Sequence, residues 1–172
     1  MPFFFFNYKK GDAMDTKKEI TVYLAEFDYQ IEQILKVYSI LKKKKDVFDN
    51  EPLAREMVES TGYWLHNLYS AFEDLFKLTA GFWENNVKTN GDFHINLLKR
   101  MLVRIEQVRP ALISEESYRF FNELRGFRHV FRHAYSFGMD DERVSFLLKR
   151  VLKKKELLIQ DLKKFRKAIA EI

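Results

Sequence analysis

The sequence predicts an all-α protein, an antiparallel bundle of about five helices. Three observations support this prediction. Apolar residues recur at spacings of three and four over long stretches, which is the period of a helix that buries one face. Only 6 Gly and 3 Pro occur among 172 residues, too few turn-forming residues for a fold of many strands. The connections between the helical stretches are short, which favours antiparallel neighbours.

The first expected helix carries one unbroken apolar face. Asp15 or Thr16 can serve as its N-cap, because a short polar side chain accepts hydrogen bonds from the first turn. The helix is expected to end in the four lysines 42–45, where the helix dipole favours cations. This position favours a solvated helix end over a nucleic-acid contact. The apolar residues alternate at spacings of four and three: Ile20, Leu24, Phe27, Ile31, Ile34, Tyr38 and Leu41.

Four further helices follow, each opened by a residue suited to a helix start. Pro52 fits the first turn of the second helix. Asp92 and Ser114 can cap the third and fourth helices, and Asp140 or Asp141 can cap the fifth. The expected ranges are 52–83, 93–107, 115–135 and 141–172.

Length and composition suit one domain, 17–172, after an extension, 1–16, that we expect to be disordered or misannotated upstream sequence. The chain has no Cys, which excludes disulfides and thiolate sites and fits a cytoplasmic location. No apolar run is long enough to span a bilayer, so no membrane partner is expected. No motif for a metal or a cofactor is recognisable. The formal charge of +5 favours encounter with polyanions such as RNA, or with an acidic partner.

The most informative segment is the polar face of the expected fourth helix. On a wheel of about 100° per residue, this face spans roughly 140° and holds no acidic residue. Like charges at these spacings repel, so phosphate oxygens or a partner's carboxylates are expected to compensate; a solvated surface is the alternative. Arg offers paired donors to phosphate and His titrates near neutrality, the residue types that metal-free RNA cleavage needs. The face consists of Arg125, Arg128, His129, Arg132 and His133.

The segment 128–133 resembles the HEPN signature, which is an Arg, a polar residue, several further residues and a His. The longer stretch 124–135 is similar to the HepT-like branch, in which a Tyr follows the His by two positions. Three further segments are similar to helices of that branch, so the resemblance covers roughly residues 17–165. Those segments are 65–76, 94–101 and 109–116.

The resemblance implies a metal-independent endoribonuclease that acts as a homodimer, with the motifs of both protomers facing one cleft. Arg128 and His133 would be catalytic and His129 would occupy the polar support position; which imidazole matters more stays open. Arg125 and Arg132 would contact RNA, with tRNA among the candidate substrates. In a site shared across a two-fold axis, Arg128 and His133 of one chain need not face the same phosphate, although they lie about 140° apart on the helix.

The resemblance also implies a partner. HepT-like toxins are commonly encoded beside a minimal nucleotidyltransferase antitoxin, which can adenylylate the Tyr of the motif, here Tyr135. On the wheel Tyr135 lies next to Arg128, so an added nucleotide would block the cleft; an ordinary aromatic at a helix end is the alternative. The second hypothesis for the whole chain is a non-catalytic helical module that binds a nucleotidyltransferase or another acidic partner.

Histidines and acids outside the motif have simpler interpretations. His66 and His94 are expected to be structural residues of their helices. Glu73 and Asp74 are candidates for pairing with the motif arginines and offsetting their repulsion. The acidic residues 140–142 fit a helix cap better than a metal site.

Overall fold

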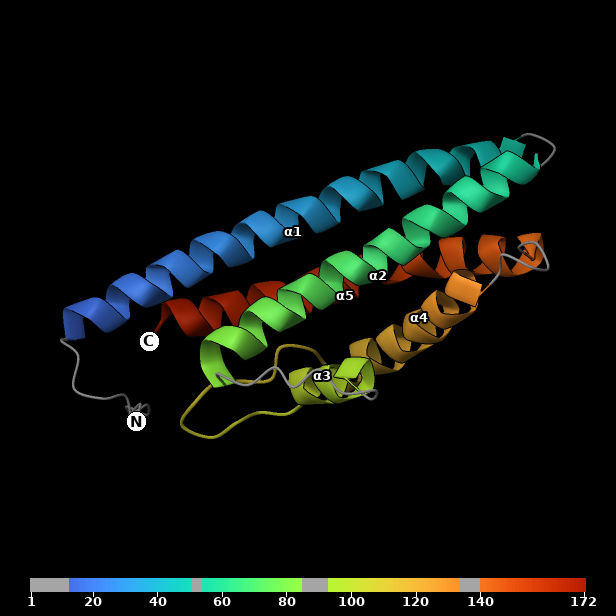
Figure 1. The fold of residues 1–172 in the computed structure, drawn as a ribbon. Coiled ribbons are helices and arrows are strands. Elements are labelled where there is room, and N and C mark those ends of the chain that lie inside the picture. Colours follow the sequence, from blue (N-terminus) through green and yellow to red (C-terminus); the bar gives the residue numbers. More distant parts are fainter. Residues whose placement is uncertain (1–12, 51–53, 85–92, 134–139) are drawn as a thin grey trace.

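A computed structural model of the protein describes residues 13–50, 54–84, 93–133 and 140–172, and within these it leaves the side chains of a few residues undescribed (Figure 1). Across the described ranges the chain forms helices and no strand, apart from one isolated bridge between Ile105 and Arg109. This confirms the predicted all-α bundle. The helices are α1 (Ala13–Asn50), α2 (Arg55–Glu84), α3 (Phe93–Leu102), α4 (Glu115–His133) and α5 (Asp141–Ala170).

Helix α2 is the centre of the bundle. It packs against α1 along most of its length, and it also contacts α3, α4 and α5 (Figure 1). Helix α5 packs on α1 as well, and the short α3 packs on α4. Consecutive long helices run in opposite directions, so the C-terminal end of α4 lies near the beginning of α5.

The predicted apolar face of α1 forms part of the core. Phe27, Ile34, Tyr38 and Leu41 are buried, and the other members of the face are partly buried against them. Tyr23, which was not part of the predicted apolar face, is also buried. Burying aromatic rings of this size is a large source of apolar stabilisation.

A second aromatic group joins α2 to α4. The ring of Phe121 lies 4.7 Å from that of Phe72 and 5.2 Å from that of Phe76, both in edge-on arrangements. All three side chains are essentially inaccessible to solvent. This packing fixes α4, which carries the candidate motif, against the central helix.

Both expected ends of α1 were wrong. The helix begins at Ala13, so Asp15 and Thr16 lie in its first turn rather than at the N-cap. It also continues past the lysines 42–45 to Asn50. Lys44 donates a hydrogen bond of 2.7 Å to Ser60 of α2, and Lys45 pairs with an acid one turn later. These contacts, with Phe48 packed on the core, favour continuation of the helix beyond the lysines.

The third helix is shorter than expected and ends at Leu102 rather than at 107. The chain then turns back on itself, with Gln107 in a left-handed conformation at φ 60°. The backbone N–H of Leu112 donates to the carbonyl of Met101 at 2.9 Å. The second helix is described from Arg55 onward, so its expected start at Pro52 lies outside the described residues, as does the expected cap Asp92.

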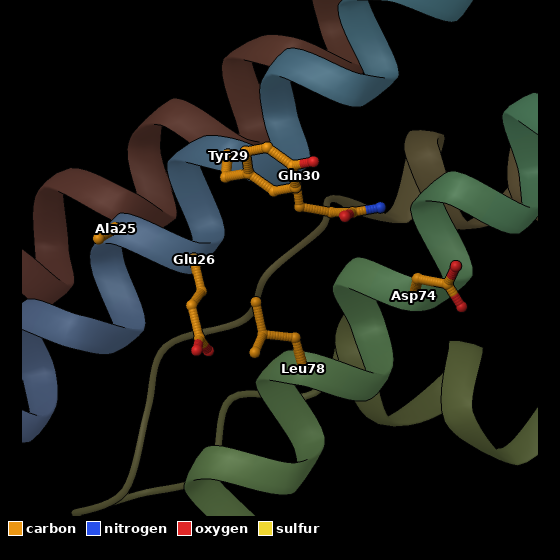
Figure 2. A pocket seen from close by; sticks show the side chains of 6 residues that line it. All are labelled: Ala25, Glu26, Tyr29, Gln30, Asp74 and Leu78. Carbon is orange, nitrogen blue, oxygen red and sulfur yellow. The ribbon is translucent and has the colours of Figure 1, made fainter.

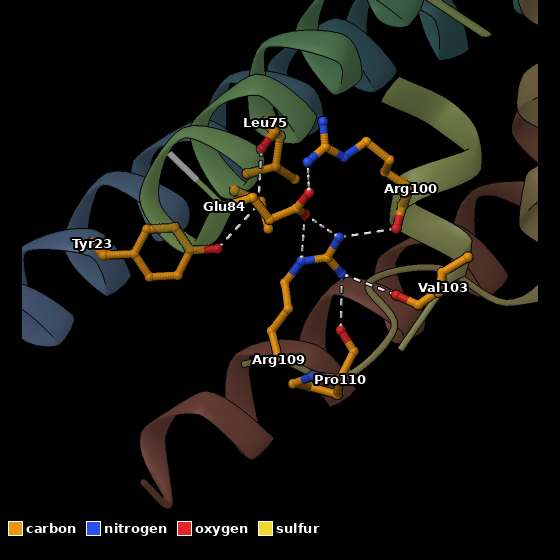
Figure 3. Close-up of polar contacts among 8 residues, drawn as sticks. Tyr23, Leu75, Glu84, Arg100, Val103, Arg109 and Pro110 are labelled. Atoms are coloured by element: carbon orange, nitrogen blue, oxygen red, sulfur yellow. Dashed lines mark hydrogen bonds and ion pairs between the residues drawn. The ribbon is translucent and has the colours of Figure 1, made fainter. Parts of the chain in front are cut away.

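A buried arginine explains why α3 ends where it does (Figure 3). Arg109 is fully buried, and its Nε and Nη2 both donate to Glu84 Oε1 at the end of α2. Its remaining N–H groups donate to the carbonyls of Arg100, Val103 and Pro110. All five donors of the guanidinium are therefore used, and the turn after α3 is held against the end of α2.

The predicted caps of α4 and α5 are confirmed. Ser114 Oγ accepts the backbone N–H of Ser117, and Asp140 Oδ1 accepts that of Arg143. Asp161 of α5 adds a link between the two helices, because one of its oxygens accepts bonds from the N–H and Oγ of Ser114 and from the Oγ of Ser117.

Candidate functional site

Arg128 projects from α4 toward α2 and α3. Its guanidinium carbon lies 5.9 Å from the centre of the Tyr69 ring on α2, a cation–π contact. Its Nη1 lies 3.4 Å from Nε2 of His94 on α3. The Arg128 side chain is half-buried, so two neighbouring helices hold its charged end at the surface of the bundle.

His94 connects Arg128 to a buried carboxylate. The Nδ1 of His94 is hydrogen-bonded to Glu73, whose side chain is only 4% exposed. A carboxylate can only accept, so Nδ1 carries the hydrogen, and in the neutral imidazole Nε2 keeps a lone pair that can accept from Arg128. The result is a directed chain from Arg128 through His94 to Glu73. We call these three residues, with Tyr69 and Lys77 beside them, the Arg128 cluster.

The charges of the Arg128 cluster influence one another. Burial raises the pKa of the Tyr69 hydroxyl well above its usual value, and the carboxylate of Glu73 raises it further, against smaller opposing effects of Arg128 and Arg125. Tyr69 therefore presents a neutral ring to Arg128 at physiological pH. Burial lowers the pKa of Lys77, but Asp74 and Glu73 outweigh it and the net pKa is raised, so Lys77 stays charged.

Two other residues of the polar face of α4, Arg125 and His129, also have described side chains. Arg125 donates from Nε and Nη2 to Oδ1 of Asn122, on its own helix. His129 is exposed. Within the described part of the chain, no carboxylate contacts the guanidinium of Arg125 or Arg128. The positive charge of these two arginines is therefore available to an anion.

The side chains of three predicted site residues lie outside the described part of the structure. His133 is the last residue of α4, and the side chains of Arg132 and His133 lie outside the described residues. Tyr135 lies outside them altogether. The roles expected for these three residues stay predictions, as does the neighbourhood of Tyr135 and Arg128.

Glu73 and Asp74, the candidates for pairing with motif arginines, make no direct contact with Arg125 or Arg128, the motif arginines whose side chains are described. Glu73 reaches Arg128 only through His94, and Asp74 pairs instead with Lys77 at 3.1 Å. His94, which we expected to be structural, thus contacts the motif arginine Arg128 in the candidate site, a contact that the sequence did not reveal. His66 stacks on the Phe131 ring at 5.4 Å, in keeping with a structural residue.

A hollow between α1 and α2 lies on another face of α2 (Figure 2). Glu26 and Tyr29 of α1 and Asp74 and Leu78 of α2 are among its lining residues. Its two carboxylates would repel phosphate. The hollow is therefore a poor site for RNA, and the Arg128 cluster remains the candidate.

The described residues form neither a metal cluster nor a membrane-spanning helix. No group of three or more His, Asp or Glu side chains among them is placed to hold a metal ion. None of the helices in the described ranges is long and apolar enough to cross a membrane.

A family model described as "HepT-like protein" matches residues 60–169, more than half of the chain. The chain belongs to the HepT-like protein family. The match includes Glu73, His94 and the motif segment 128–133, and it confirms the family resemblance inferred from that motif. It begins after α1, so the expected resemblance of the first helix lies outside it. No curated protein and no solved structure matches this HepT-like protein.

Proposed function

We propose that this HepT-like protein is a metal-independent endoribonuclease, with Arg128 and His133 as catalytic residues. The observation that carries the proposal is the environment of the Arg128 guanidinium. Its guanidinium is held by Tyr69 and His94, and no carboxylate among the described residues neutralises it. A preorganised cation of this kind stabilises an anion where charge develops in a transition state.

RNA supplies its own nucleophile for the proposed reaction. The ribose 2′-oxygen attacks the adjacent phosphorus while a base removes its proton. The bond from phosphorus to the 5′-oxygen breaks, and an acid protonates that oxygen, so the products are a 2′,3′-cyclic phosphate and a free 5′-hydroxyl. Arg128 would stabilise the negative charge on the phosphorane-like centre, and His133 would transfer a proton, with His129 as the support or second imidazole.

The biological setting that we propose is a toxin–antitoxin pair. The protein would act as a homodimer in which Arg125 and Arg132 of both protomers bind RNA, tRNA being one candidate. A nucleotidyltransferase antitoxin would silence it by adenylylating Tyr135. Membership of the HepT-like family and the net charge of +5 support this setting.

The test is cleavage of several RNAs, including tRNA, by purified protein in excess chelator. We expect Arg128→Ala to lower kcat by about 10²- to 10³-fold, and His133→Ala by about 10²- to 10⁴-fold. Arg119→Ala is the matched control, because Arg119 is an exposed arginine of the same helix that pairs with Glu115. It should cleave like the wild type.

Cleavage that leaves cyclic-phosphate ends and is lost in both motif variants would support the proposal. Cleavage abolished by the chelator would contradict the mechanism. Absence of cleavage by wild type with an unmodified Tyr135, confirmed by mass spectrometry, would favour the alternative of a non-catalytic module that binds a nucleotidyltransferase or another acidic partner.

A further inference from the structure

We propose that Glu73 and His94 are positioning residues for Arg128, a role whose catalytic consequence rests on the proposed function. Arginine has a long side chain with many rotamers, so a free Arg128 would place its charge over a wide area. In the structure, three helices converge on it: α4 supplies the arginine, α3 supplies His94, and α2 supplies both Glu73 and Tyr69. The pair would hold the guanidinium where the phosphate binds.

The burial of Glu73 gives this arrangement its rigidity. A carboxylate that is 4% exposed needs partners, because an unpaired buried charge is strongly unfavourable. Its partners are His94 on one oxygen and Lys77, at 3.4 Å, on the other. His94 therefore cannot rotate away without leaving the buried carboxylate short of a donor.

The hydrogen bond from His94 to Glu73 also determines whether the ring nitrogen of His94 that faces Arg128 is an acceptor or a donor. In the neutral imidazole with its hydrogen on Nδ1, the Nε2 of His94 is an acceptor for the Nη1 of Arg128 at 3.4 Å. If Glu73 were absent, the hydrogen could move to Nε2 and two donors would face each other. Glu73 would thus act on Arg128 through His94, without touching it.

The first experiment does not depend on cleavage. Long-range ¹H–¹⁵N NMR of the full-length protein, above the titration of the imidazole, reports which nitrogen of His94 carries the hydrogen. We expect the Nδ1–H form in the wild type and a shift toward Nε2–H in Glu73→Met. Asp74→Asn is the control, because Asp74 shares Lys77 with Glu73 but does not contact His94. An Nε2–H form in the wild type would overturn the proposal.

The second experiment compares two replacements of His94 by RNA cleavage. The amide of Gln reaches the place of Nε2 and can accept from Arg128, whereas the amide of Asn reaches only the place of Nδ1. We expect His94→Asn to lower kcat by about 10- to 100-fold with little change in KM, and His94→Gln to restore most of kcat. His94→Asn keeps an N–H donor for Glu73 and should keep the wild-type melting temperature within a few degrees, whereas His94→Gln leaves one oxygen of the buried carboxylate without its donor and should lower it.

The outcomes separate this proposal from the proposed function. If wild type does not cleave RNA, the proposed function fails, and the NMR result alone decides whether Glu73 directs His94 toward Arg128. If wild type cleaves but His94→Asn and His94→Gln are equally active, the positioning role is refuted while the ribonuclease stands. A loss confined to His94→Asn and an Nδ1–H form in the wild type would establish it.

Discussion

Replacing Arg109 with Ala should destabilise the bundle strongly. Its removal would leave three backbone carbonyls and Oε1 of Glu84 without the donor that now serves them; the Glu84 side chain is 5% exposed, and only its Oε2 would keep an ion pair, with Arg100. Breaking a buried ion pair by removing one partner costs about 3–5 kcal/mol of unfolding free energy. For a chain of this length, each kcal/mol corresponds to about 2–4 °C, so the melting temperature should fall by about 6–20 °C.

The assay is thermal and urea unfolding followed by circular dichroism. Arg104→Ala is the matched control, because Arg104 is an exposed arginine of the same connection, and its loss should change the free energy by less than about 0.5 kcal/mol. Arg109→Lys should give an intermediate loss, since an ammonium keeps the charge but cannot reproduce five fixed donors. If Arg109→Ala unfolded like Arg104→Ala, the reasoning that this network holds the end of α3 would be refuted.

Two further predictions concern other buried polar groups. Asp161→Ala should lower the free energy of unfolding by about 1.5–3 kcal/mol in urea denaturation, because the carboxylate accepts three bonds at the start of α4; an unchanged midpoint would contradict this. Burial raises the pKa of Tyr23 to about 12, so the stability that its protonated hydroxyl provides is complete below pH 10 and is lost as pH rises through 12. Tyr23→Phe should therefore reduce the loss of unfolding free energy between pH 10 and 12, by up to about 1.4 kcal/mol per pH unit. Parallel plots of unfolding free energy against pH for the wild type and Tyr23→Phe would argue against this.

The sequence predicted the existence and order of the five helices better than it predicted the residues at which they begin and end. Helical periodicity extends over many residues, and the caps Ser114 and Asp140 act within one turn, so both can be recognised locally. The lysines 42–45 were a misleading stop signal, although Phe48 continues the apolar pattern beyond them. The end of α3 depends on Arg109, which is brought to Glu84 from 25 residues away.

For the candidate site, too, only part of the arrangement could be predicted from the sequence. The motif arginine and its family could be inferred from the sequence, because the residues 128–133 follow one another on a single helix. The contacts of His94 could not be inferred, because they join positions 21 and 34 residues apart on three helices. One signal was present: Glu73 lies four residues after Tyr69 and three before Phe76, on the apolar face of α2, and an acidic residue on such a face needs a partner.

By itself, the sequence determined the all-α class, the order of the helices, the family and the presence of a cationic face on α4. These properties follow from local periodicity and from a contiguous motif. Only the tertiary structure decided that Arg128 faces Tyr69 and His94, that Glu73 lies behind His94, and that His129 is exposed. The physical reason is that a helical wheel gives directions around one axis, whereas the neighbour of each side chain depends on how separate helices pack.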